Sequence, residues 1–273
     1  MSKIIFLLSL KPIIYGLIGM ILSGVSFPLA GVIIMQNGLV PLRYMLMHGV
    51  MLGGIFSIAF RLPVLPVSIA VNILLVIVMM FFNNNYRQRN LLVSSSTMMV
   101  ITMGLASLMS HIFNIPAQDT LDILWGSPFA LTTSDILILS LLTVFIITYV
   151  TCCFRKISML FFDKDIALSM NVNVKIHGFL MVFASTLVVS AAMKIIGALL
   201  IDALVILPVN IGIRKAKSLK ALFIRSSLTG TIISVTAYFI SLAVNLPVSG
   251  VMALLASLYF GISCILEKIG RKK

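Results

Sequence analysis

KIIGALLIDALVILP, residues 194–208, is an apolar stretch with a single carboxylate, Asp202, near its centre. A charged side chain near the middle of a bilayer costs about 2.5–3.5 kcal/mol on insertion scales, so such an acid normally faces a protein interior or a water-filled path. Asp202 is therefore a candidate functional residue. The alternative is a protonated carboxyl that joins two helices through a hydrogen bond. Pro208 lacks the N–H that would bond the carbonyl of Leu204, so we expect the helix to loosen one turn beyond the acid.

The composition of the whole chain indicates a polytopic integral membrane protein. Of its 273 residues, 60% are apolar and 10% are charged, and the mean hydropathy is +1.18. A soluble domain of this composition would aggregate. The net charge is +13, but excess Lys and Arg in a membrane protein more often reports its orientation than nucleic-acid binding. We expect contact with membrane lipid and no nucleic-acid partner.

Apolar runs predict nine transmembrane helices, with eight or ten as alternatives. A spanning helix needs about 17–25 apolar residues. The run 45–60 is short for this purpose, and 177–213 is long enough for two helices that meet near residues 194–197. The clear runs are 13–36, 62–82, 92–112, 135–154, 221–245 and 247–266.

The distribution of basic residues predicts the orientation. If the C-terminus is cytoplasmic, 16 of the 20 Lys and Arg residues fall in cytoplasmic segments, as the positive-inside rule requires. The N-terminus then lies outside. The loop 113–134 also faces out, and it carries Asp119 and Asp122 but no Lys or Arg. The cytoplasmic segments are 37–44, 83–91, 155–176, 214–225 and 267–273.

The segment RYMLMHGVMLGG, residues 43–54, contains a candidate metal ligand. Gly49 and Gly53 are four residues apart and make a groove on one helix face, while His48 and Tyr44 share another face. A neutral imidazole is a good ligand for zinc, manganese or iron. A hydrogen-bonded structural histidine is the alternative.

The segment FFDKDIALSMNVNV, residues 161–174, predicts a short amphipathic helix. Asp163 can cap its start, Asp165 suits its first turn, and Asn171 or Asn173 can end it. The helix is too short to span a bilayer, so it either lies on lipid headgroups or docks into a groove of a soluble partner. Its apolar stripe, with Lys164 on the polar side, consists of Phe162, Ile166 and Met170.

Catalytic signatures are absent from the sequence. It contains no GxxxxGK[ST] phosphate loop, no GxSxG elbow and no HExxH pair. We therefore expect the chain not to be an enzyme. Any ATP hydrolysis would belong to a separate subunit.

Seven motifs follow one another along nearly the whole chain: FPLAGV (27–32), HGVMLG (48–53), LWGS (124–127), FDKDIA (162–167), IGALL (196–200), ALVILP (203–208) and LPVSG (246–250). In this order they resemble the permease subunits of bacterial ABC importers for zinc, manganese and iron. The resemblance implies an all-α polytopic membrane protein with about 8–9 transmembrane helices and the type II importer fold. It further implies a single permease domain over residues 1–273 in the bacterial inner membrane.

The resemblance also implies partners. These are a second permease subunit, in a homodimer or heterodimer, cytoplasmic ATPase subunits, and an extracytoplasmic metal-binding protein. A divalent metal ion would be the transported substrate, with no permanently bound cofactor. Residues 161–174 would be the coupling helix, with the apolar stripe in the ATPase groove and Asp163 and Lys164 pairing at its rim.

Two positions depart from the family. Members commonly carry an acid four residues before the histidine that matches His48, and here that residue is Tyr44, whereas Asp202 stands where the family usually has a small or apolar residue. We hypothesise that Asp202 supplies the missing carboxylate and contacts the ion together with His48, after Asp119 and Asp122 have attracted it. About 12 Å of helix separates Lys194 from Asp202, so we do not expect these two to pair.

Other functions remain open at this point. A permease of the same architecture could carry a siderophore or haem, for which loss of the family acid would make sense. An autonomous proton-coupled cation carrier could use Asp202 as its titrating group.

Overall fold

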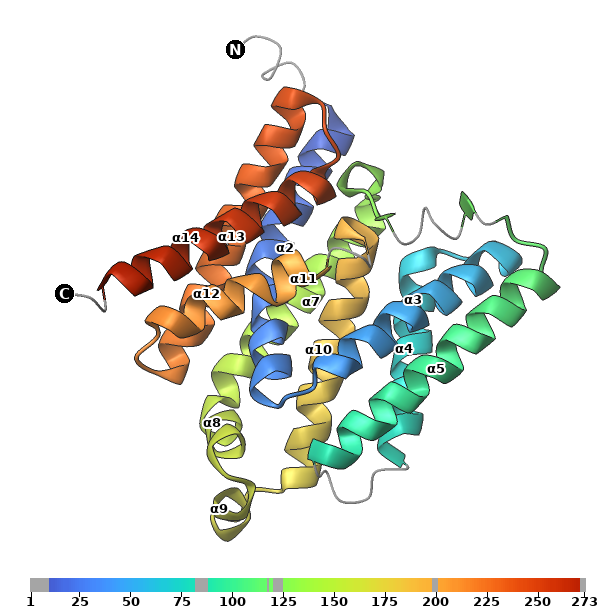
Figure 1. Ribbon diagram of the computed structural model, residues 1–273. Helices are drawn as coiled ribbons and strands as arrows, with labels where there is room; N and C mark the ends of the chain where they lie inside the picture. The colour runs from blue at the N-terminus through green and yellow to red at the C-terminus, as the bar shows by residue number, and fades with distance from the viewer. Residues whose placement is uncertain (1–9, 82–87, 117, 120–124, 198–200, 271–273) are drawn as a thin grey trace.

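The computed structural model describes residues 10–81, 88–116, 118–119, 125–197 and 201–270 (Figure 1). Within these ranges, eight helices are long and apolar enough to cross a bilayer. They are α2 (Lys11–Gln36), α3 (Val40–Phe60), α4 (Val64–Phe81), α5 (Gln88–Ile112), α7 (Thr133–Cys152), α10 (Val174–Ile196), α13 (Leu219–Val244) and α14 (Val248–Gly270). The shorter elements are η1 (Pro128–Ala130), α8 (Phe154–Phe162), α9 (Lys164–Ser169), α11 (Ile201–Val205) and α12 (Leu207–Lys215).

Helices α2 and α10 lie at the centre of the bundle. Figure 1 shows α3, α4 and α5 on one side of them and α12, α13 and α14 on the other. α2 packs along α13, α7 and α10, while α3 packs along α4 and α5. The central helices are the most buried of the long helices, because they contact protein on several sides and leave the outer helices to face lipid.

The long apolar run 177–213 forms one spanning helix and two short ones. α10 ends at Ile196, and Gly197 follows it with φ 86°, a conformation that favours glycine. The predicted meeting point near residues 194–197 is therefore confirmed, but the second predicted helix is broken. Its two pieces, α11 and α12, are separated by Ile206, and Pro208 lies in the first turn of α12. The missing N–H of Pro208 explains why the helix loosens there.

The broken helix still connects the two faces of the bundle. At one end, Gly126 in the loop before α7 lies directly against the backbone of Gly197 and has φ +60°. At the other end, Arg225 of α13 donates from Nη1 to the carbonyl of Lys215 at 2.7 Å. If α11 and α12 are counted as one crossing, the described helices make nine crossings. An odd number places the two ends of the bundle on opposite faces, as the basic residues predict.

Candidate functional site

Asp202 lies in the first turn of α11 and forms an ion pair with Arg43 of α3. The Arg43 side chain is 6% exposed, whereas the Asp202 side chain is 46% exposed. The acid is thus balanced by a cation from a neighbouring helix. The side chain of Lys194, the other basic residue considered for this role, lies outside the described residues.

Arg43 lies in a helix, and not in the cytoplasmic segment that we predicted over residues 37–44. α3 begins at Val40, so Arg43 is in its first turn, and the residue is buried. Its guanidinium carbon lies 4.2 Å from the centre of the Tyr44 ring, in cation–π geometry. We did not identify Arg43 as the partner of Asp202 from the sequence, because we counted it only among the basic residues that predict the orientation. The available signal was the intramembrane acid itself, since such an acid requires a partner.

His48 lies on α3, five residues after Arg43 and about 7.5 Å further along the helix axis. It is half-buried, and its Nδ1 is buried without a hydrogen-bond partner in the described part of the chain. A buried ring nitrogen without a partner is unfavourable unless a ligand or water reaches it. Tyr44, one turn earlier, is 42% exposed. His48 thus keeps unused bonding capacity at Nδ1.

Two glycines on the same helix, Gly49 and Gly53, allow α3 to pack tightly against α4. A side chain at Gly49 would collide with Asn72, and one at Gly53 would collide with Ser68, both on α4. The predicted glycine groove is therefore confirmed, and α4 fills it. This packing holds α3, and with it His48, against α4 and α10.

Asn72 is a polar residue of this region that sequence reasoning did not single out. It is fully buried. Its Nδ2 donates to the carbonyl of Leu46 on α3 at 3.1 Å and to Oγ of Ser190 on α10 at 2.7 Å. One amide thus joins three helices beside the candidate ion contact. The sequence feature that could have identified Asn72 is that it is the single asparagine in the apolar run 62–82.

The structure describes one of the two predicted outer acids. Asp119 is exposed, and Asp122 lies outside the described residues. Among the residues that the structure describes, no three His, Cys, Asp or Glu side chains form a group that could hold a metal ion. A transported ion that contacts His48 or Asp202 would therefore need further ligands from water or another subunit.

The predicted cytoplasmic helix is present as α9, but it is shorter than predicted. Asp163 caps it and accepts from the N–H of Asp165 at 2.7 Å and of Ile166 at 3.2 Å. The helix ends at Ser169, and Asn171 follows with φ 62°. Asn173 instead caps the start of α10 by accepting from the N–H of Ile176.

The apolar stripe of residues 161–174 is shared between two helices. Phe162 ends α8, and the extended backbone at Asp163 separates it from α9. Phe162, Ile166 and Met170 are nevertheless all exposed, at 82%, 47% and 53%. Partial burial lowers the pKa of the neighbouring Lys164. Figure 1 shows α8 and α9 projecting from one end of the bundle, so these apolar side chains are available to a partner.

The sequence matches a known transporter family over most of its length. The model of the ABC 3 transport family covers residues 9–267. The manganese import system permease protein ScaB of Streptococcus parasanguinis is 30% identical over 173 residues, 63% of this chain and 59% of ScaB. The manganese transport system membrane protein MntC of Listeria monocytogenes is 26% identical over 148 residues, 54% of this chain and 52% of MntC. The match thus spans between half and two thirds of these curated relatives.

The fold matches over a longer range than the sequence. PsaBC from Streptococcus pneumoniae, solved in complex with a Fab, gives a TM-score of 0.81 at 23% identity and covers 96% of this chain and 94% of the matched chain. The prediction of an all-α type II importer permease fold in the bacterial inner membrane is confirmed by this likeness, by the relatives and by the eight long apolar helices among the described residues. The chain is a multi-pass membrane protein that belongs to the ABC 3 transport family, as its resemblance to the permease subunits of metal ABC importers predicts.

Proposed function

We propose that this chain is the translocation subunit of an ABC importer for a divalent transition metal ion, with manganese as the first candidate and zinc and iron as the next. The observation that carries the proposal is the meeting of Asp202 with α3, the helix that bears His48. The names of the relatives ScaB and MntC support manganese. Carboxylate oxygen with imidazole nitrogen is a ligand pair that suits manganese, zinc and iron.

Arg43 has a defined role in this proposal. In the ion-free state its guanidinium neutralises Asp202, which makes an acid tolerable inside the membrane. An arriving divalent ion takes the carboxylate from Arg43 because two cations cannot share it without strong repulsion. The displaced guanidinium keeps a partner in the Tyr44 ring. His48 then offers its free Nδ1 as a second contact.

The remaining parts of the importer follow from the same proposal. Asp119 and Asp122 attract the cation where an extracytoplasmic binding protein releases it. The exposed side chains of Phe162, Ile166 and Met170 dock on a cytoplasmic ATPase. A second permease subunit completes the path. Closure of the ATPase subunits shifts α8 and α9 and opens the path alternately to each side.

ATP-dependent uptake of radioactive manganese into proteoliposomes tests the proposal. The wild-type chain with its ATPase partner is compared with His48→Ala and Asp202→Asn. Both changes should reduce uptake at least tenfold, because each removes a proposed ligand. Glu267→Gln is the matched control, since it removes the acid of another Arg–carboxylate pair, with Arg214, at the far end of α14, and it should transport normally.

Three outcomes would contradict parts of the proposal. Normal uptake by Asp202→Asn would remove Asp202 from the ion path. ATP hydrolysis without uptake of manganese, zinc or iron would leave the architecture but refute the substrate class, and haem or a siderophore would be the next substrate to test. Uptake without any ATPase would indicate an autonomous carrier.

A further inference from the structure

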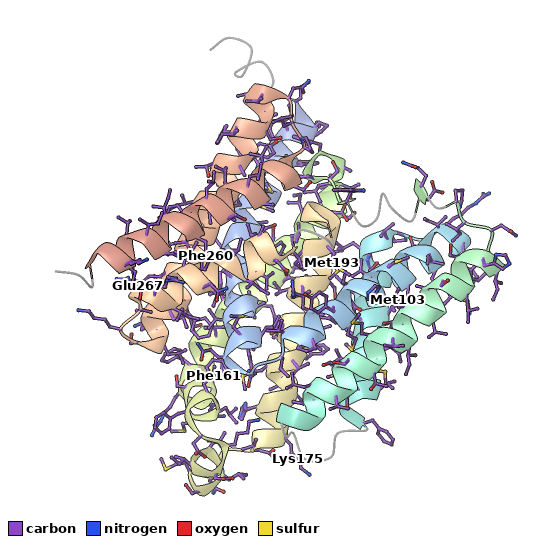
Figure 2. The ribbon with its side chains drawn as sticks, viewed as in Figure 1. Met103, Phe161, Lys175, Met193, Phe260 and Glu267 are labelled. Atoms are coloured by element: carbon purple, nitrogen blue, oxygen red, sulfur yellow. The ribbon has the colours of Figure 1, made fainter. Side chains whose placement is uncertain are left out.

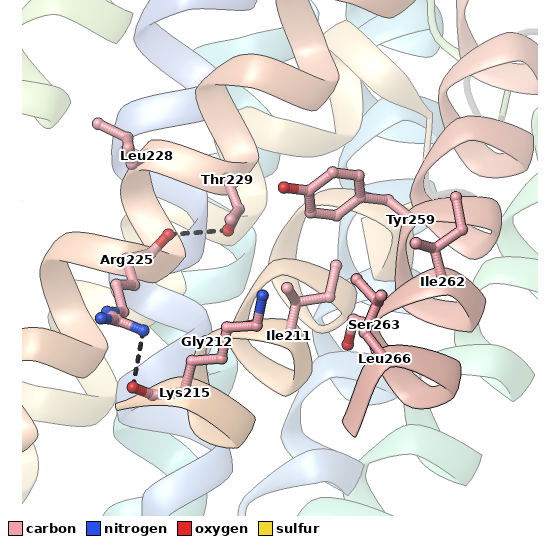
Figure 3. Close-up of a pocket in the computed structure, with 10 residues that line it drawn as sticks. All are labelled: Ile211, Gly212, Lys215, Arg225, Leu228, Thr229, Tyr259, Ile262, Ser263 and Leu266. Carbon is pink, nitrogen blue, oxygen red and sulfur yellow. Dashed lines mark hydrogen bonds between the residues drawn. The ribbon is translucent and has the colours of Figure 1, made fainter. Parts of the chain in front are cut away.

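A cavity of about 200 Å³ lies between α12, α13 and α14, at the ends where the basic segment 214–225 is found (Figure 3). It is separate from Asp202, His48 and the α8–α9 surface. Its apolar wall includes Leu228, Ile262 and Leu266. These three side chains are 62%, 53% and 53% exposed. In a membrane protein such an exposed apolar wall faces the acyl chains of lipids.

The polar wall of the cavity contains hydroxyl groups with unused bonding capacity. Ser263 is 5% exposed, and its Oγ is buried without a hydrogen-bond partner in the described part of the chain. Thr229 donates its hydroxyl proton to the carbonyl of Arg225 at 2.8 Å, which leaves its oxygen free to accept. Figure 3 shows the Tyr259 hydroxyl directed toward Thr229. A buried hydroxyl such as that of Ser263 is costly unless a ligand satisfies it.

The charge of the cavity is positive. Lys215 and Arg225 line it, and none of its lining residues is acidic. Figure 3 shows the Lys215 ammonium extending from α12 toward the space between Thr229 and Tyr259. The nearby acid, Glu267, is paired with Arg214 at 2.5 Å. The cavity thus combines the Lys215 ammonium and a free hydroxyl donor with an apolar, lipid-facing wall, while the Arg225 guanidinium is bonded to the Lys215 carbonyl at its edge (Figure 3).

We propose that this cavity binds the phosphate of an anionic phospholipid from the cytoplasmic leaflet. Lys215 contacts the phosphate, the Ser263 hydroxyl donates to an oxygen of the headgroup region, and the acyl chains lie along Leu228, Ile262 and Leu266. Basic pockets between transmembrane helices on the cytoplasmic side are suited to anionic headgroups. A lipid satisfies both walls at once, whereas a soluble phosphate satisfies the polar wall alone.

The site joins the lipid to the broken helix. α12 follows α11, which carries Asp202, after the single residue Ile206. A lipid held between α12, α13 and α14 therefore stabilises the position of α12, the second part of the broken helix. Because the ligand binds the folded state, it raises the unfolding temperature.

The test measures thermal unfolding of the full complex in nanodiscs of phosphatidylcholine, with and without added phosphatidylglycerol. Phosphatidylglycerol should raise the unfolding temperature of the wild type by several degrees. Lys215→Gln should lose most of this rise, and Lys215→Arg should keep it. Lys217→Gln is the matched control, because it removes the same charge from an exposed neighbouring position outside the cavity, and it should behave as the wild type.

A second variant, Ser263→Ala, distinguishes a loss of lipid binding from a general loss of stability. Ser263→Ala removes the unpaired hydroxyl and should reduce the rise without lowering the unfolding temperature in pure phosphatidylcholine. An equal loss in Lys215→Gln and Lys217→Gln would show a general effect of membrane charge and overturn the site. If inorganic phosphate in phosphatidylcholine nanodiscs reproduced the rise, the ligand would be soluble phosphate and the lipid proposal would be wrong. None of these outcomes depends on transport of a metal.

Discussion

The candidate ion path depends on four residues, which are Asp202, Arg43, His48 and Asn72. Their environments follow one rule, that a polar group inside a membrane protein needs a partner. Arg43 neutralises Asp202, and Asn72 bonds to α3 and α10. His48 has a buried Nδ1 without a hydrogen-bond partner among the described residues, as Arg43 has at Nε and Asn72 at Oδ1. Of these atoms the neutral imidazole nitrogen is the best ligand for a divalent transition metal ion, which is the physical reason to place a ligand contact at His48.

We predict that Asn72→Ala destabilises the protein by about 0.6–2 kcal/mol, the range that membrane-protein and model-peptide values for interhelical hydrogen bonds span. The change leaves the Leu46 carbonyl without the Nδ2 donor and the Ser190 hydroxyl without its interhelical partner. Thermal unfolding in detergent would measure the effect. Ser257→Ala, an exposed position on α14, is the control and should unfold as the wild type does. An equal unfolding temperature in both variants would show that the amide does not hold the three helices together.

At the scale of elements, the broken helix α11–α12 depends on a close approach to α2. A side chain at Gly31 of α2 would collide with the backbone carbonyl of Val205, the last residue of α11. The helix is loosened near Val205 because Pro208 has no N–H to donate. The backbone at Val205 can then approach α2 closely because Gly31 has no side chain. Neither α11 nor α12 is long enough to be stable alone. Their positions are therefore set by packing on α2, α13 and α14.

Gly31→Ala should accordingly displace α11 and cost about 1–3 kcal/mol, as overpacking in a tight core does. Gly104→Ala is the control, because nothing lies within 4 Å of a side chain added there. Unfolding temperature and metal uptake should both fall in Gly31→Ala and stay normal in Gly104→Ala. Normal behaviour of both variants would mean that α2 and α11 are not in close contact.

The cap of α9 makes a separate prediction. Asp163→Ala removes the acceptor for two backbone N–H groups and should cost about 1 kcal/mol of local helix stability. If α9 transmits the ATPase movement, stimulation of ATP hydrolysis by the permease should fall. Asp163→Asn retains a capping oxygen and should restore most of it. Failure of Asn to rescue would indicate that the charge at this position, and not the cap, matters for coupling.

At the scale of the whole molecule, the orientation follows from the count of crossings. In the described part of the chain, eight long helices and one broken helix place the α12–α13 turn on one face and the α13–α14 turn on the other (Figure 2). Lys and Arg are concentrated on the first of these faces. The positive-inside rule therefore assigns that face to the cytoplasm.

Thiol labelling of intact cells checks this orientation. In a background in which Cys152, Cys153 and Cys264 are replaced by serine, Leu246→Cys should react with a membrane-impermeant maleimide. Lys217→Cys should react only after the cells are permeabilised. Both positions are exposed, so accessibility alone would not separate them. The reverse pattern would invert the topology.

The sequence by itself determined the class of protein, the places where most helices lie, and the family. These properties depend on local composition: a run of some twenty apolar residues must form a spanning helix, and glycine, proline and capping residues act on their immediate neighbours. Gly197, Asp163 and the break before Pro208 were predictable for this reason. The tertiary structure alone decided which residues meet. The pairing of Arg43 with Asp202, the links made by Asn72 and the cavity around Ser263 each join helices that are distant in the chain. Such contacts depend on how the helices pack, and no local pattern in one sequence encodes that.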